Sequence, residues 1–255
     1  MQHIHTVSRP GFARLYRSPS ITVARLTLES YLRSGWMWGE FVLVLVFFAA
    51  LFFPFMENVA YFYGTSAWDL SAIAVLGAVV MVRQSTSART YVVLARLTSR
   101  AAYSRGLILA TAALRVPILL FFCALVLVAH RLTNPTPGTM VISALGLLPI
   151  TILAATLTVT FTSPIGTRRK RMLLLIWIAV VLFSLSPLIL LPQIVVGALS
   201  FSRIPLAPIA VCYNVSVNGS IDVNSLWGFP LIVTYIVGLA WLAGYWLEKK
   251  ELLLY

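Results

Sequence analysis

Few residues of this sequence can do chemistry inside an apolar environment, and Arg115 is the foremost of them. It falls well inside a long apolar run, 104–129. An arginine at the middle of a membrane span costs about 2.5–3.5 kcal/mol on translocon scales, so we expect Arg115 to face the protein interior or a wet cavity. It either contacts an anionic group of a substrate, or is satisfied by backbone carbonyls or by snorkelling to the interface.

Two other residues, both in the first apolar run, are candidates for a substrate path. Glu40 falls near one end of the first apolar run, 38–56, where it can stay wet or pair with an arginine. Phe47 lies in the middle of the same run and would suit a hydrophobic substrate, although phenylalanines in spans usually serve packing. We take Arg115, Phe47 and Glu40 as the candidate substrate path.

The sequence contains no motif typical of an enzyme. It has no GxxxxGK[ST] phosphate loop, no HExxH and no GxSxG. Its three histidines are terminal or in an expected outer turn, and Cys123 and Cys212 fit neither a zinc site nor a disulfide framework. We therefore expect no catalytic residue, no metal and no cofactor in this chain.

A basic segment, Arg83–Arg105, separates two long apolar runs. It holds five arginines and no acid, and such segments favour the cytoplasmic side of a membrane. Its centre, Tyr91–Leu94, is too apolar for a solvated loop. We interpret the segment as a short helix at the membrane surface that docks into a cytoplasmic partner.

The composition places the whole chain in a membrane. Of 255 residues 60% are hydrophobic and only 10% are charged, against about 25% charged in soluble domains. A bilayer core needs about 20 apolar residues per helix. We expect an all-α fold with one transmembrane domain, 1–255, and six spans at 38–56, 68–82, 104–129, 139–162, 172–191 and 226–247.

The net charge of +12 does not indicate a nucleic-acid partner, because the basic residues follow the topology. All except Arg115, Arg131 and Arg203 fall in segments on one side of the six expected spans. This asymmetry is the positive-inside pattern and predicts a multi-pass protein of the cell membrane with both termini cytoplasmic.

The remaining segments are expected at the membrane surfaces. Residues 1–36 form an arm and an amphipathic helix that Ser20 caps, with an apolar side containing Ile21, Ala24, Leu28, Tyr31 and Leu32. Glu29 precedes Arg33 in the favourable order for an ion pair. On the outer side we expect a loop at 57–67, a wet Asp69, and a re-entrant hairpin at 193–208.

The basic segment resembles the coupling helix of type 2 ABC transporter membrane subunits, which reads like GT-x-E-x-LL-x-x-P-x-SR-x-x-x-x-x-GK. Thr90 begins the matching stretch, Ser99–Arg100 matches the SR, and Gly106 matches the glycine that opens the third span. Val93 and Leu94 stand at the apolar pair. Arg89 replaces the usual glycine, and the usual proline is missing.

This resemblance implies a fold and a function for nearly the whole chain. Six spans follow an amphipathic helix, and the coupling segment, 83–103, lies between the second and third spans. The chain would be the permease subunit of an ATP-driven exporter, in the lipid bilayer with a second permease subunit and ABC ATPase subunits that bind ATP and Mg. The residues that would contact the ATPase are Arg89, Thr90, Tyr91, Val92, Leu94, Arg96 and Arg100.

Two other functions remain open on the sequence. An ion-coupled secondary carrier would act alone and use Arg115 as the substrate anchor. A non-transporting membrane scaffold would bind cytoplasmic partners without any flux. The first alternative is weakened because all seven acids are expected near interfaces or in loops.

Overall fold

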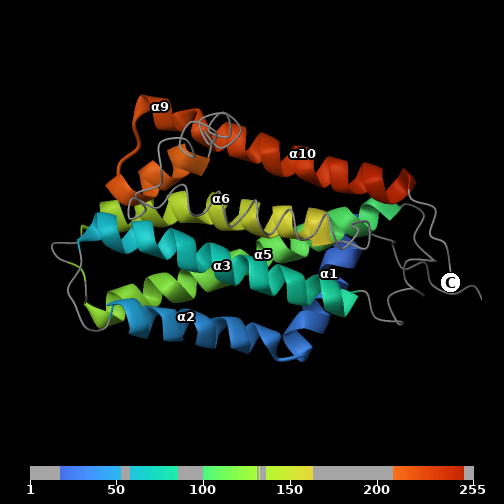
Figure 1. Cartoon of the computed structure of the whole chain (residues 1–255), viewed down its shortest axis with the longest axis horizontal. Helices are drawn as coiled ribbons and strands as arrows, with labels where there is room; N and C mark the ends of the chain where they lie inside the picture. The colour runs from blue at the N-terminus through green and yellow to red at the C-terminus, as the bar shows by residue number, and fades with distance from the viewer. Residues whose placement is uncertain are drawn as a thin grey trace, which may run out of the picture.

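The computed structural model describes residues 18–52, 58–85, 100–130, 132, 136–162 and 209–249. Regular structure in these ranges is helical, which confirms the all-α class. Figure 1 shows that the long helices lie lengthwise beside one another and that the first helix crosses them near one end. The helices are α1 (Pro19–Arg33), α2 (Trp36–Phe52), α3 (Val59–Ser85), α5 (Arg100–Ala129), α6 (Pro137–Thr162), the short helix Ile209–Asn218, α9 (Val223–Leu226) and α10 (Gly228–Lys249).

Four of these helices, α3, α5, α6 and α10, are long and apolar enough to cross a membrane. The bent pair α1 and α2 passes the same test when taken together, which gives up to five spans in the described ranges. The chain is therefore a multi-pass membrane protein. The expected span at 172–191 and the expected hairpin at 193–208 lie outside the described residues.

Helix α1 begins two residues earlier than the sequence indicated. Ser18, not Ser20, is the N-cap: its side chain accepts a hydrogen bond from the backbone N–H of Ile21, and Pro19 occupies the first turn. The helix ends at Ser34 and Gly35. Gly35 has φ +77°, a conformation that glycine adopts at little cost, and the chain turns there by 68° into α2.

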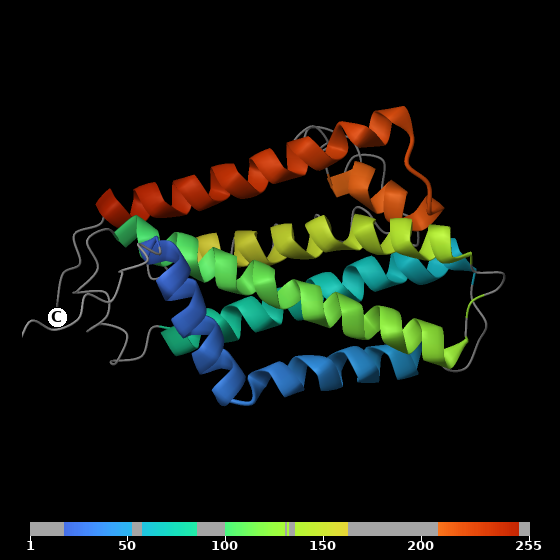
Figure 2. The ribbon, with the colours of Figure 1, turned by 180° about the vertical axis from the view of Figure 1, so that it is seen from behind.

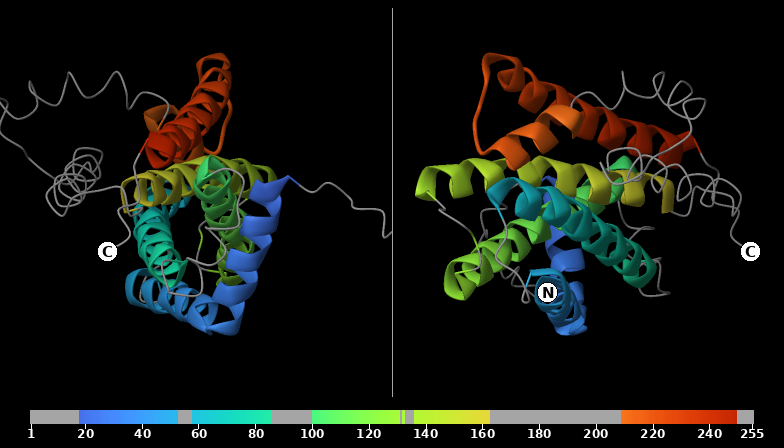
Figure 3. Two further views of the ribbon diagram at one scale, coloured as in Figure 1. Left: turned by 90° about the vertical axis from the view of Figure 1, so that its right-hand side faces the viewer. Right: turned by 60° about the vertical axis from the view of Figure 1, so that its left-hand side comes forward.

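The buried side of α1 agrees with the expected one in part. Tyr31 is buried and Ala24 and Leu28 pack against the core, but Ile21 and Leu32 are exposed and Val23 is buried instead. Packing against α5 selects this side, and Figure 3 shows α1 lying along the flank of the bundle. Glu29 pairs with Arg25 at 2.7 Å rather than with Arg33, and this hydrogen bond lowers the pKa of Glu29.

Helix α3 starts at Val59, so most of the expected outer loop 57–67 is helical. The reason is burial: the aromatic side chains of Phe62 and Tyr63, expected at the interface, are fully enclosed. Phe62 stacks on Phe122 of α5 with ring centroids 5.5 Å apart. Asp69 consequently lies within the helix and not at its outer edge.

The second half of the chain packs through small residues. Helix α6 lies beside α3 and α5, and α10 lies along α5 and α6 on the other side (Figure 1). The short helix Ile209–Asn218 approaches α6 at Gly146, where an added Cβ would lie 2.7 Å from the carbonyl oxygen of Cys212. Glycine at this position permits contact between the two backbones.

Candidate functional site

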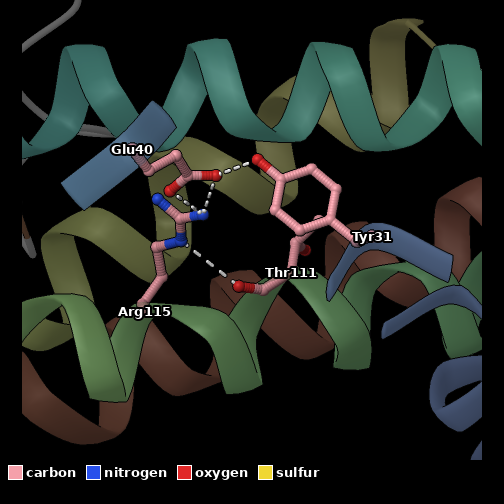
Figure 4. A network of polar contacts seen from close by, with 4 residues as sticks. All are labelled: Tyr31, Glu40, Thr111 and Arg115. Carbon is pink, nitrogen blue, oxygen red and sulfur yellow. Dashed lines mark hydrogen bonds and ion pairs between the residues drawn. The ribbon is translucent and has the colours of Figure 1, made fainter. Parts of the chain in front are cut away.

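A buried ion pair joins α2 to α5 (Figure 4). Nη2 of Arg115 lies 2.8 Å from Oε2 of Glu40 and donates a hydrogen bond to Oε1 at 3.2 Å. Only 2% of the Arg115 side chain and 4% of the Glu40 side chain are exposed. Two opposite charges removed from water in this way must compensate each other, because an isolated ion would be strongly unfavourable there.

Two further groups complete the cluster. The hydroxyl of Tyr31, in the last turns of α1, donates a hydrogen bond to Oε1 of Glu40. A phenol keeps its proton at neutral pH and therefore acts as a donor to the carboxylate. Nε of Arg115 donates to the backbone carbonyl of Thr111 at 3.3 Å, one turn earlier in α5. Nη1 of Arg115 is buried without a hydrogen-bond partner among the described residues.

The local sequence explains how these side chains meet. Figure 2 shows the bend between α1 and α2, which lies at Gly35. Tyr31 and Glu40 lie on either side of this bend, and their side chains face each other (Figure 4). Helix α3 contributes Gly77: a Cβ there would lie 2.0 Å from Oε1 of Glu40 and 3.0 Å from Nη2 of Arg115. The missing side chain of Gly77 is the space that the carboxylate occupies.

Of the two expectations for Glu40, a wet position or a pairing with an arginine, the structure shows the pairing. Glu40 is buried, and its partner is the arginine of another helix. The guanidinium of Arg115 makes the expected contact to a backbone carbonyl and, in addition, an ion pair that neutralises its charge. Phe47 is partly buried and packs against the main core. The cluster links α1, α2 and α5, and Nη1 of Arg115 is its one buried nitrogen without a hydrogen-bond partner among the described residues.

Sequence reasoning missed Tyr31 and Gly77 as members of this site. Tyr31 was assigned to an apolar side, and nothing marks Gly77 as the neighbour of a carboxylate. One signal was available: an acid and an arginine that both fall in apolar runs are expected to pair. Their separation of 75 residues gives no spacing pattern that would reveal the pair.

A second region of interest is the base of the bundle, where the segment 86–99 leaves α3 and enters α5. The hydroxyl of Tyr103 donates to the carbonyl of Ser85 at 2.9 Å, which ties the two ends together. Gln84 Nε2 donates to Ser34 Oγ at 3.0 Å, at the corner between α1 and α2. Tyr103 also packs with Val23 of α1 and Leu247 of α10.

Of the residues expected to contact an ATPase, the structure describes Arg100 alone. Arg89, Thr90, Tyr91, Val92, Leu94 and Arg96 lie outside the described residues, and Arg100 is the first residue of α5. Gly106, expected to open a span, lies inside α5, where an added Cβ would meet Ser20 O at 2.6 Å and Val23. Glycine there lets α1 lie directly on α5.

Apart from Glu40 and Arg115, the ionisable groups in the part of the chain that the structure describes do not gather into a second candidate site. Oδ2 of Asp69 is buried without a hydrogen-bond partner there. Glu40 is buried by helix packing, and Asp69 is partly buried within α3. Within the described ranges no three potential ligands (His, Cys, Asp or Glu) gather as a metal site.

The chain matches no protein family, no curated protein and no solved structure. Its function is therefore inferred from its own residues and contacts.

Proposed function

We propose that this chain is the permease subunit of an ATP-driven type 2 ABC exporter and forms half of the translocation path. A separate ATPase subunit couples to it through the segment around Ala88–Arg100. The observation that supports this best is the base of the bundle. There the two ends of this segment are tied together by Tyr103 and Ser85, and are joined to the surface helix by Gln84 and Ser34.

The charge distribution supports a cytoplasmic position for this base. Four arginines are exposed: Arg83 at the end of α3, Arg105 near the start of α5, and Arg25 and Arg33 of α1. Figure 1 shows the end of α3, the start of α5 and α1 at the same end of the bundle. Because basic residues remain on the cytoplasmic side, this end faces the cytosol in the proposal. Arginines at this end of the bundle could form ion pairs with acidic residues of a partner or with anionic lipid headgroups.

A mechanism follows from these connections. ATP and Mg bind the partner chain, and closure of the ATPases displaces the segment 86–99. Because the segment emerges from α3 and enters α5, its displacement acts directly on two spans. The contacts at Ser34 and Val23 carry the motion to α1 and α2. Two permease subunits would then rock against each other and open an outward path between them.

The direct test is a pull-down of the tagged chain from its own cells in mild detergent, followed by mass spectrometry. We expect an ATPase with a phosphate loop to co-purify, together with a second permease subunit that is either this chain or a related one. A chain that is recovered alone, stable and monomeric contradicts the proposal.

Exchanging Tyr91 and Leu94 together for aspartate should uncouple ATP hydrolysis from transport. Charges placed in an apolar docking surface are desolvated without partners, so we expect transport to fall at least about tenfold while the spans stay folded. The measurement compares flux and ATPase activity in proteoliposomes. Tyr91→Phe with Leu94→Met is the matched control, since it keeps the apolar surface. Full coupling in the aspartate variant removes this segment from the proposal.

One observation favours the ion-coupled carrier as a second candidate. Asp69 presents a buried carboxylate oxygen without a partner among the described residues, and intramembrane acids often line ion paths. A carrier predicts gradient-driven flux in proteoliposomes without any ATPase, and Asp69→Asn should abolish that flux. A scaffold predicts stable partners but no flux in either assay.

A further inference from the structure

Helix α1 is joined to α2 at a corner that contains a glycine. Gly35, with φ +77°, and Ser34 separate it from α2, and the two helices meet at a bend of 68°. The side of α1 that faces away from the bundle is exposed, including Leu26 and Arg33. A helix with one covered side and a glycine corner can move as a unit if the contacts of its covered side are released.

Those contacts are of two kinds. Near the start of α1, Val23 packs against the backbone of α5 at Gly106, and apolar packing of this kind has no strict direction. Near its end, Tyr31 is buried and its hydroxyl donates to Glu40. A hydrogen bond to a carboxylate is directional and about twice as strong as a neutral one. Tyr31 therefore adds a directional contact to the apolar packing of α1 on α5.

The charges of the cluster remain compensated when Tyr31 leaves. Glu40 keeps both of its contacts to Arg115, at 2.8 and 3.2 Å, and Arg115 keeps the carbonyl of Thr111. Withdrawal of the phenol thus breaks one hydrogen bond and strands no unpaired ion. By contrast, separation of Glu40 from Arg115 would leave two uncompensated charges. The cluster contains a permanent part and a releasable part.

We propose that the Tyr31 hydroxyl is a latch that docks α1 on the Glu40–Arg115 pair, and that α1 swings about Gly35 when the latch opens. The docked state is the one described above. This inference concerns the chain alone and does not rest on the proposed function. If the chain is an exporter subunit, the latch lies beside the base where the segment 86–99 attaches.

The test measures the position of α1 by double electron–electron resonance on the full chain in nanodiscs. Cys123 and Cys212 are replaced by alanine, and spin labels are placed at Leu26 of α1 and Val128 at the far end of α5, both exposed. Tyr31→Phe is compared with Tyr61→Phe, the control at an exposed tyrosine. We expect Tyr31→Phe to raise the ratio of displaced to docked α1 about tenfold, the usual effect of losing one hydrogen bond to a charged group.

A second pair of labels, at Leu120 of α5 and Val237 of α10, reports on the bundle itself. Its distance distribution should be the same in all three proteins. Identical Leu26–Val128 distributions in Tyr31→Phe and Tyr61→Phe would overturn the latch. So would a broadening of both label pairs, because the hydroxyl would then support the whole bundle. A Tyr31→Phe chain that does not fold would also overturn it, since a releasable contact is not required for folding.

Discussion

Replacing Glu40 with leucine should destabilise the purified chain by about 3–5 kcal/mol, because it leaves Arg115 as a buried charge without a counter-ion. The ion pair is almost completely enclosed, at 2% and 4% side-chain exposure, so water cannot replace the lost carboxylate without opening the bundle. The measurement is thermal or denaturant unfolding in detergent, followed by the fluorescence of the native tryptophans.

The control is the double variant Glu40→Leu with Arg115→Met, which removes both charges and keeps similar volumes. Replacement of a whole buried pair by apolar residues is often neutral or stabilising, so the double variant should recover most of the lost stability. Recovery would show that the single variant suffers from the stranded arginine. Equal stability of the single variant and the wild type would contradict the observed pairing.

Exchange of Gly77 for alanine should destabilise the chain by about 1–3 kcal/mol, the usual effect of overfilling a packed site. The added Cβ would lie 2.0 Å from Oε1 of Glu40, so the carboxylate must move, and the contacts to Tyr31 and Arg115 move with it. Gly238 of α10 is the matched control, because nothing lies within 4 Å of a Cβ there. Gly238→Ala should be neutral or stabilising by up to about 1 kcal/mol.

The reason for the Gly77 effect can be separated from simple crowding by a double-mutant cycle. If the clash with Glu40 is the cause, Gly77→Ala should have little further effect in a Glu40→Ala background, because the carboxylate is already absent. The two substitutions then couple by about 0.5–3 kcal/mol, the range seen for residues in contact. Additive effects would place the clash elsewhere.

Much of the fold could be predicted because it depends on local composition. The apolar runs around 104–129, 139–162 and 226–247 became α5, α6 and α10 with small shifts at their ends. A helix before the first apolar run was predicted from its periodicity, and α1 is that helix. Its N-cap was displaced from Ser20 to Ser18 because Pro19 fits only the first turn. Serine is a favourable N-cap at either position, so the residue type alone does not show at which serine the helix begins.

The errors in prediction arose where burial, not composition, decides. Residues 57–67 have the aromatic character of an interface, yet Phe62 and Tyr63 are core residues, and α3 extends through them. Aromatic side chains serve both roles equally well, so their type cannot distinguish a loop at the headgroups from a packed turn of helix. Asp69 was placed at an outer edge because the expected loop ended at residue 67, whereas α3 already begins at Val59.

The sequence alone determined that this is a multi-pass helical membrane protein, since hydrophobicity and helix length are properties of each segment taken separately. Only the tertiary structure decided which groups meet. Arg115 was visible as a costly residue, but its partner, Glu40, is 75 residues away in sequence. Tyr31 reaches that pair because Gly35 turns the chain, and Gly77 matters because α3 passes over it. These contacts depend on how helices pack against one another, and a distance between packed helices is not encoded in the spacing of residues along either one.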